Sequence, residues 1–406
     1  MLVNILKWLI LCTLCGFLIG SASAFFLVSL DWVTVFREHH FELIYFLPIS
    51  GLLIGSLYYF YGKQISAGNN LIINNINQPT ERISFLMTPF IYITTIVTHF
   101  FGGSAGREGT ALQMAAGISD QFCRPFGLDS ENRRILLIAS VAAGFGSVFG
   151  TPLAGIVFSL EFARVGQIKF DALFPALLCC VVADFTTTTV WGVSHTLYSV
   201  GVLPNLTIST FGFTIFSGIL FGLCAIVFVV MMQFFSQKFK ILIKSEILRP
   251  FFGGILVVVL ILLIGTRYIG LGVPYIVQSF TTYSAPYDFF MKILFTTITL
   301  SCGFKGGEVT PLFFIGATLG SALAWFVPLP IGLLAGLGFV AVFSGCTKTP
   351  LACTIMAIEL FGAKIGIYAA IACITAFYFS GKYSIYAAQL RSENPYDFLQ
   401  NKNRKS

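Results

Sequence analysis

The sequence predicts an all-α polytopic membrane protein. Of its 406 residues, 56% are hydrophobic and only 10% are charged, and the mean hydropathy is +0.87. A soluble globular chain carries roughly 25% charged residues. Apolar runs of about 17–25 residues cross the hydrocarbon core as helices. Runs of this kind occupy residues 43–60, 85–101 and 211–235, and somewhat shorter ones occupy 251–265 and 365–379.

The first apolar segment begins at the N-terminus. Residues 1–24 end in "SASA", a pattern typical of the cleavage site of a signal peptide. The apolar run continues through "FFLVSLDWVTVF" to Phe36, far past the hydrophobic region of a signal. We therefore expect an uncleaved first membrane helix.

Glycine-rich breaks separate the shorter apolar pieces. They are "SAGNN" at 66–70, "GGSAGREG" at 102–109, "GLG" at 270–272 and "GFKGGEVTP" at 303–311. Non-helical backbone at membrane depth persists only where protein or a water-filled cavity satisfies its polar groups. Each break precedes an apolar run, so each predicts a helix N-terminus whose free N–H groups and positive dipole end attract an anion.

The second break carries charge at membrane depth. Glu108 is a carboxylate at a place that attracts anions, and an ionisable residue in a membrane segment is a functional candidate. Ionised, it would occupy the site as a tethered anion; protonated, it would leave the site or donate a hydrogen bond to an incoming anion. The alternative is a loop carboxylate paired with Arg107. Arg107 either adds positive field, fixes the loop or faces a membrane surface.

Two blocks of the sequence occur twice. "TPLAGIVFSLEF" at 151–162 returns as "TPLACTIMAIEL" at 349–360, and "GREGTAL" at 106–112 aligns with "GGEVTPL" at 306–312. We therefore expect two homologous membrane repeats, with discontinuous helices that meet near the bilayer midplane around a substrate site. The predicted boundaries are 1–195 and 205–390, followed by a short cytoplasmic tail at 391–406. Glu161 and Glu359 match in the repeat, and we expect them to stabilise helix ends or the cytoplasmic surface.

Charge and reactive residue types exclude several functions. The net charge is +7, and basic residues cluster at 238–249 and 402–405, which the positive-inside rule places in the cytoplasm. The ten cysteines and four histidines show no metal-type spacing, and no nucleophile–base motif is visible. A nucleic-acid binder needs basic residues among exposed aromatics on a soluble domain. We expect no enzyme activity, no cofactor and no nucleic-acid partner.

The combination of "GREG" at 106–109, "TPLAG" at 151–155, "GG…TP" at 306–311 and a second "TPLA" at 349–352 resembles the CLC family. This family comprises anion channels and proton-coupled antiporters, and the resemblance extends from about residue 10 to 390. It implies a lipid-embedded homodimer with a pore in each subunit, an inverted repeat and helix N-termini directed at a central anion. It also implies that Glu108 is the external gating glutamate and that the hydroxyl of Tyr386 contacts the central anion.

Three departures from the family pattern resemble its fluoride/proton antiporter branch in bacteria. The serine motif GSGIP is replaced by "SAGNN", so that Ala67 stands at the anion-coordinating serine. Phe162 occupies the position of the intracellular proton-relay glutamate of chloride/proton exchangers. The tripeptide region resembling GIFAP is "GGEVTP", which adds Glu308 and Thr310.

Fluoride is small and tightly hydrated, so a selective site must offer compact, strong donors in place of water. The Thr310 hydroxyl and a protonated Glu108 are donors of this kind. Thr310 could also simply cap the following helix, a role compatible with anion contact. Glu308 could hold Thr310, neutralise part of the field or carry protons. The predicted function is proton-coupled fluoride export across a bacterial inner or plasma membrane; the alternative is a chloride/proton antiporter or chloride channel.

The residues implied in gating or proton coupling are Glu108 and Glu308. Those implied in anion binding are Ala67, Gly68, Asn69, Asn70, Gly106, Arg107, Gly109, Val309, Thr310 and Tyr386.

Overall fold

The computed structural model describes residues 2–79 and 82–391, and this part of the chain is almost entirely helical. The first eight α-helices are α1 (Leu2–His39), α2 (Leu47–Phe60), α3 (Asn69–Asn77), α4 (Met87–Phe100), α5 (Glu108–Ser119), α6 (Ser130–Phe149), α7 (Pro152–Phe162) and α8 (Leu173–Phe185). The next eight are α9 (Ile208–Leu242), α10 (Leu248–Ile264), α11 (Val273–Gln278), α12 (Asp288–Ser301), α13 (Val309–Leu323), α14 (Ile331–Thr347), α15 (Pro350–Phe361) and α16 (Gly366–Phe379). Two short strands, β1 (Arg164–Val165) and β2 (Leu390–Arg391), pair in parallel.

The lengths and apolar composition of the helices are those expected of a membrane protein. Four helical stretches of the described chain are long and apolar enough to cross a bilayer, namely Ile5–His39, Phe41–Phe60, Phe170–Val190 and Ile208–Leu242. The first runs without interruption through "SASA" to His39, and whether it is cleaved stays a prediction. Several of the shorter apolar helices begin at a proline (α7, α15), directly after one (α14) or after a glycine-rich break (α13), so the predicted discontinuous helices are confirmed.

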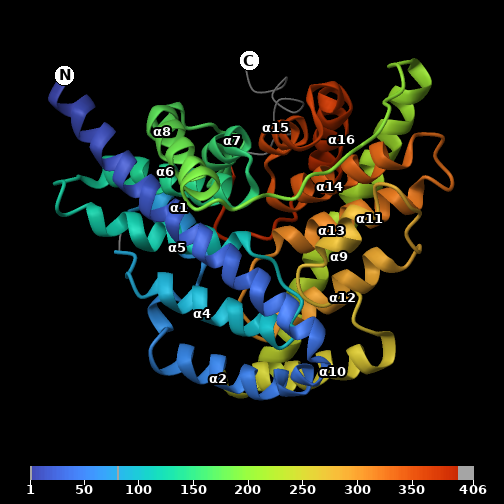
Figure 1. Cartoon of the computed structure of the whole chain (residues 1–406), viewed down its shortest axis with the longest axis horizontal. Helices are drawn as coiled ribbons and strands as arrows, with labels where there is room; N and C mark the ends of the chain where they lie inside the picture. The colour runs from blue at the N-terminus through green and yellow to red at the C-terminus, as the bar shows by residue number, and fades with distance from the viewer. Residues whose placement is uncertain (1, 80–81, 392–406) are drawn as a thin grey trace, which may run out of the picture.

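The two halves of the chain have the same order of helices. Each half begins with a long helix (α1, α9), contains a very short third helix (α3, α11) and ends with a hairpin followed by a helix of 13 or 14 residues. Figure 1 shows the first half mostly on the left and the second half mostly on the right. This arrangement supports the proposal of two repeats at 1–195 and 205–390. The predicted tail lies outside the described residues except for residue 391, as does the basic cluster at 402–405.

Helices α7 and α15 from opposite halves lie side by side and cap one another (Figure 1). The carboxylate of Glu161, near the end of α7, accepts hydrogen bonds at 3.3 and 2.9 Å from two N–H groups at the start of α15. The carboxylate of Glu359, near the end of α15, accepts bonds at 2.9 and 2.7 Å from the start of α7. These N–H groups have no partner within their own helices. The prediction that both glutamates stabilise helix ends is confirmed.

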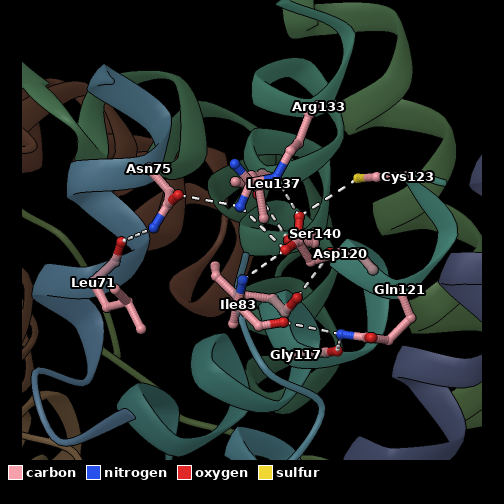
Figure 2. A network of polar contacts seen from close by, with 12 residues as sticks. Leu71, Asn75, Ile83, Gly117, Asp120, Gln121, Cys123, Arg133, Leu137 and Ser140 are labelled. Carbon is pink, nitrogen blue, oxygen red and sulfur yellow. Dashed lines mark hydrogen bonds and ion pairs between the residues drawn. The ribbon is translucent and has the colours of Figure 1, made fainter. Parts of the chain in front are cut away.

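A buried ion pair ties α3, α5 and α6 together (Figure 2). Asp120, directly after α5, accepts bonds from Arg133 Nε at 2.6 Å and from the Ile83 N–H at 2.7 Å. Arg133 also donates to Asn75 Oδ1 on α3 at 3.1 Å. The C-terminal parts of α3 and α5 are therefore held in a fixed relation, which also orients their N-termini.

Candidate functional site

The glycine-rich breaks before α5 and α13 meet in the interior. Gly106 and Gly307 form an antiparallel bridge in which each N–H donates to the other's carbonyl oxygen. A Cβ on Gly106 would lie only 2.8 Å from Glu108 Oε2 and 2.9 Å from Pro311 Cδ. Glycine is therefore required for this close approach of the two backbones.

Glu108 is the first residue of α5, but its carboxylate lies on the N-terminus of α13. Its side chain is fully buried. Oε2 accepts hydrogen bonds from the Thr310 N–H at 3.0 Å and from the Arg107 N–H at 3.1 Å. Oε1 accepts a hydrogen bond from the Thr310 hydroxyl. A helix N-terminus is a favourable place for negative charge because its N–H groups are free and its dipole end is positive. The carboxylate occupies that place as a tethered anion would.

Arg107 is the N-cap residue of α5 and contributes in two ways. Its backbone N–H donates to Glu108, and its Nε lies 3.7 Å from Glu108 Oε1. The ion pair considered in the sequence analysis is therefore present. Because the hydrogen bonds from α13 are shorter and more numerous, the ion pair does not account for the position of Glu108.

Thr310 lies inside α13 and does not cap it. The N-cap residue of this helix is Glu308, whose side chain makes no capping hydrogen bond, and the buried Val309 follows it. The Thr310 hydroxyl donates across to Glu108 instead. The alternative in which Thr310 serves as a helix cap is wrong, because the helix begins one residue earlier.

Glu308 is directed toward the N-terminus of α5. A Cβ on Gly109 would lie 3.6 Å from Glu308 Oε2 and 3.0 Å from Asn69 Nδ2. Both Glu308 Oε2 and Asn69 Oδ1 are buried and have no hydrogen-bond partner in the described chain. Glu308 does not hold Thr310, because the Thr310 hydroxyl is bonded to Glu108. The other two interpretations of Glu308 remain proposals.

The "SAGNN" break forms the start of α3. Gly68 is the N-cap residue and adopts φ +57°, a left-handed conformation that favours glycine, and Asn69 follows as the first helical residue. Asn70 Oδ1 accepts a hydrogen bond from the Ala388 N–H at 3.0 Å. Ala67 is exposed and provides no hydroxyl.

The segment of residues 380–389, which carries Tyr386, contacts both halves of the chain. Tyr386 is buried, and its ring packs edge-on against Phe162 with centroids 4.9 Å apart. Gln389 Nε2 donates to the carbonyl oxygens of Phe162 at 2.9 Å and of Thr347 at 2.8 Å. The Ile385 N–H donates to the carbonyl oxygen of Cys346, the residue before Thr347 in α14, at 3.0 Å.

The described contacts thus bring together Asn69, Gly106, Arg107, Glu108, Gly109, Glu308 and Thr310. Tyr386 lies two residues before Ala388, whose N–H donates to Asn70, the neighbour of Asn69. Ala67 is exposed and is not part of the cluster.

Comparison with known proteins identifies the family. A family model described as voltage gated chloride channel matches residues 50–381. The chain belongs to the CLC family. It is 48% identical over 392 residues to a chloride/fluoride channel protein of Pseudomonas syringae pv. tomato, a match that covers 95% of this chain and 86% of the relative.

Solved structures support the same family assignment. The crystal structure of a CLC-type fluoride/proton antiporter superposes with a TM-score of 0.93 at 35% identity, covering 97% of this chain and 100% of that one. A slow cyanobacterial Cl−/H+ antiporter matches with a TM-score of 0.81 at 18% identity, over 92% and 94% of the chains, and shows the shared fold. The predicted CLC resemblance and all-α membrane fold are confirmed, and CLC proteins are transporters or channels.

Two polar residues near the Tyr386 segment of this CLC protein were not singled out from the sequence. Gln389 has no motif that would reveal it, because its importance comes from two carbonyl groups distant in the chain. Lys348 does have a signal in the sequence. The repeated "TPLA" is preceded by Gly150 in the first half and by Lys348 in the second.

Proposed function

We propose that this CLC protein exports fluoride in exchange for protons across a bacterial inner or plasma membrane, in which it spans the bilayer several times. The observation that carries the proposal is the Glu108 carboxylate on the N-terminus of α13, held by both the N–H and the hydroxyl of Thr310. The similarity to a chloride/fluoride channel protein and to a fluoride/proton antiporter supports fluoride as the substrate.

In this mechanism Glu108 and the anion compete for the same donors. Ionised Glu108 occupies the N-terminus of α13 and excludes other anions. Protonation removes its negative charge, so its attraction to the helix N-terminus weakens and the carboxyl group leaves. The Thr310 N–H and hydroxyl then become available to fluoride. Since each exchange protonates and deprotonates Glu108, anion movement is coupled to proton movement.

Selectivity for fluoride follows from the donors at the site. The Thr310 hydroxyl is compact, and a protonated Glu108 offers an acidic O–H whose hydrogen bond to an anion is strong. Ala67 supplies no hydroxyl at the position where the family's chloride site has a serine. A small, tightly hydrated anion gains most from strong short donors.

The proton route uses Glu108 rather than a second relay. Phe162 is fully buried, cannot carry a proton and packs against Tyr386. The neighbouring Glu161 is bonded to the start of α15. Glu108 therefore exchanges protons on both sides by moving through the pathway as the anion passes, and Glu308 near Gly109 is the carboxylate placed to assist it.

The assembly is proposed to be a homodimer surrounded by lipid, as the family resemblance implies. The outward faces of α8 and α16 offer apolar surface for such contacts. Exposed side chains there include Phe174, Leu177, Val181, Ile367 and Ile374.

Purified protein in liposomes tests the function. Under an imposed proton gradient, fluoride efflux measured with an electrode should be much faster than chloride efflux and should be accompanied by proton uptake. Faster chloride than fluoride efflux would replace the proposal with chloride transport, and fluoride flux without proton movement would indicate a channel. In cells, hydrogen fluoride enters as a neutral acid and ionises inside, so deletion of the gene should increase fluoride sensitivity, most at acidic external pH.

A further inference from the structure

Lys348 adopts a backbone conformation that a lysine does not favour. It is the C-cap residue of α14 with φ 64° and ψ 38°, and among the described residues it alone combines a side chain with positive φ. The matching C-cap residue of α6 is Gly150, with φ 68° and ψ 33°. Glycine adopts this left-handed conformation without strain, whereas residues with a Cβ do so at a cost. A costly residue kept where glycine would suffice points to a role for its side chain.

The ammonium group of Lys348 is buried, and few polar groups offset the cost of burying its charge. The residue is 3% exposed, and Nζ donates to Ser380 Oγ at 2.6 Å and lies 5.7 Å from the centroid of the Phe377 ring. No carboxylate forms an ion pair with it in the described part of the chain. An ammonium group has three donors, and a buried charge is costly unless it is paired. The C-terminus of α16 offers only a partial negative charge.

Lys348 is also next to the residues that hold the Tyr386 segment. The carbonyl oxygen of Thr347 accepts a bond from Gln389, and that of Cys346 accepts one from Ile385, which precedes Tyr386. The hydroxyl to which Lys348 donates belongs to Ser380, at the start of the same segment. The ammonium group therefore lies at the start of the segment that carries Tyr386.

We propose that Lys348 is an anion-binding residue whose ammonium group provides the counter-charge for a small halide beside the Tyr386 segment. This inference rests on the proposed anion transport but not on the identity of the halide. The remaining N–H donors of the ammonium group bind the ion as it passes.

Three variants of the full-length protein test this role. K348G removes the charge and leaves a residue suited to the backbone, K348R keeps the charge, and K382Q removes an exposed lysine from the same segment. Initial efflux from liposomes is measured against the internal concentration of fluoride and, separately, of chloride. Thermal unfolding in detergent reports folding, and isothermal titration reports halide binding without transport.

The expected result for K348G is a half-saturating halide concentration raised about tenfold, the order expected for one charge-assisted hydrogen bond. Its unfolding temperature should stay close to that of the parent, because relief of backbone strain offsets the lost contact with α16. K382Q should bind and transport like the parent, and K348R, which keeps the positive charge, should bind halide more tightly than K348G. Unchanged binding and half-saturation in K348G would overturn the proposal and leave Lys348 as a cap of α16. If the protein carries chloride and not fluoride, the proposed function fails. The role of Lys348 is then tested by the half-saturating chloride concentration, which K348G should raise by the same factor.

Discussion

Replacement of Thr310 with valine removes one hydroxyl from the anion site and preserves the shape of the side chain. The hydroxyl donates to Glu108 Oε1, whereas the Thr310 and Arg107 N–H groups, at 3.0 and 3.1 Å from Oε2, remain in the variant. A hydrogen bond to a charged group contributes about 1.5–3 kcal/mol. Since 1.4 kcal/mol is a factor of ten, T310V should hold an anion about 10- to 100-fold more weakly at this position.

The loss should affect fluoride more than chloride. Fluoride depends most on short, strong donors, so the fluoride-over-chloride preference of T310V should fall by about tenfold or more. The variant should still fold and keep its assembly state, because valine has nearly the same volume and the N–H groups of α13 are unchanged. T310S retains the hydroxyl and is the matched control.

Parallel liposome experiments measure the prediction. Initial fluoride and chloride efflux are recorded for the parent, T310V and T310S, while size-exclusion chromatography and thermal unfolding verify that the variants are intact. An unchanged fluoride preference in T310V would refute the reasoning and show that the hydroxyl only orients Glu108. Loss of preference in T310S as well would mean that the methyl group, and not the hydroxyl, is what matters.

The site and its supports allow three further predictions. E108Q should abolish proton movement driven by an anion gradient, because an amide cannot take part in the exchange; proton pumping at the normal rate would contradict the gating role. E161Q should keep proton-coupled transport and lose about 1 kcal/mol of stability, since the carboxylate caps α15 and does not relay protons; loss of coupling with intact anion flux would restore a two-glutamate mechanism. D120N should destabilise the protein by about 1.5–3 kcal/mol, because it replaces the charged acceptor of Arg133, whose side chain is 11% exposed, with a neutral amide. The control is E131Q, because the Glu131 side chain is 72% exposed in its ion pair with Arg134, and this variant should unfold at the temperature of the parent protein. Equal unfolding temperatures for D120N and E131Q would mean that the pair of Asp120 and Arg133 does not stabilise α3 and α5.

The helix breaks could be predicted from the sequence because their causes are local. Glycine-rich stretches between apolar runs cannot continue a helix inside a membrane unless protein satisfies their backbone groups. The breaks before α3, α5 and α13 are where the pattern places them. The internal repeat, visible in "TPLA" and in the matching glutamates, likewise indicated that the ends of α7 and α15 correspond.

The partners of Glu108 could not be predicted in the same way. The sequence placed Glu108 at the start of α5, where it would be expected to interact with its own helix or with Arg107. Only the packing of the two halves carries its carboxylate to α13, because the bridge between Gly106 and Gly307 brings two distant helix N-termini together.

Composition, periodicity and repeated motifs determined the membrane fold and the helix breaks, since these depend on neighbours in the chain, and the resemblance to the CLC family pointed to the residues of the site. Tertiary structure decided which donor faces which acceptor. Thr310 could be interpreted as a cap until the start of α13 was known, and Lys348 was not singled out before its left-handed backbone and buried ammonium group were seen. These hydrogen bonds join groups 202 residues apart (Glu108 and Thr310) and 32 residues apart (Lys348 and Ser380), and the spacing of residues along the chain does not contain that information.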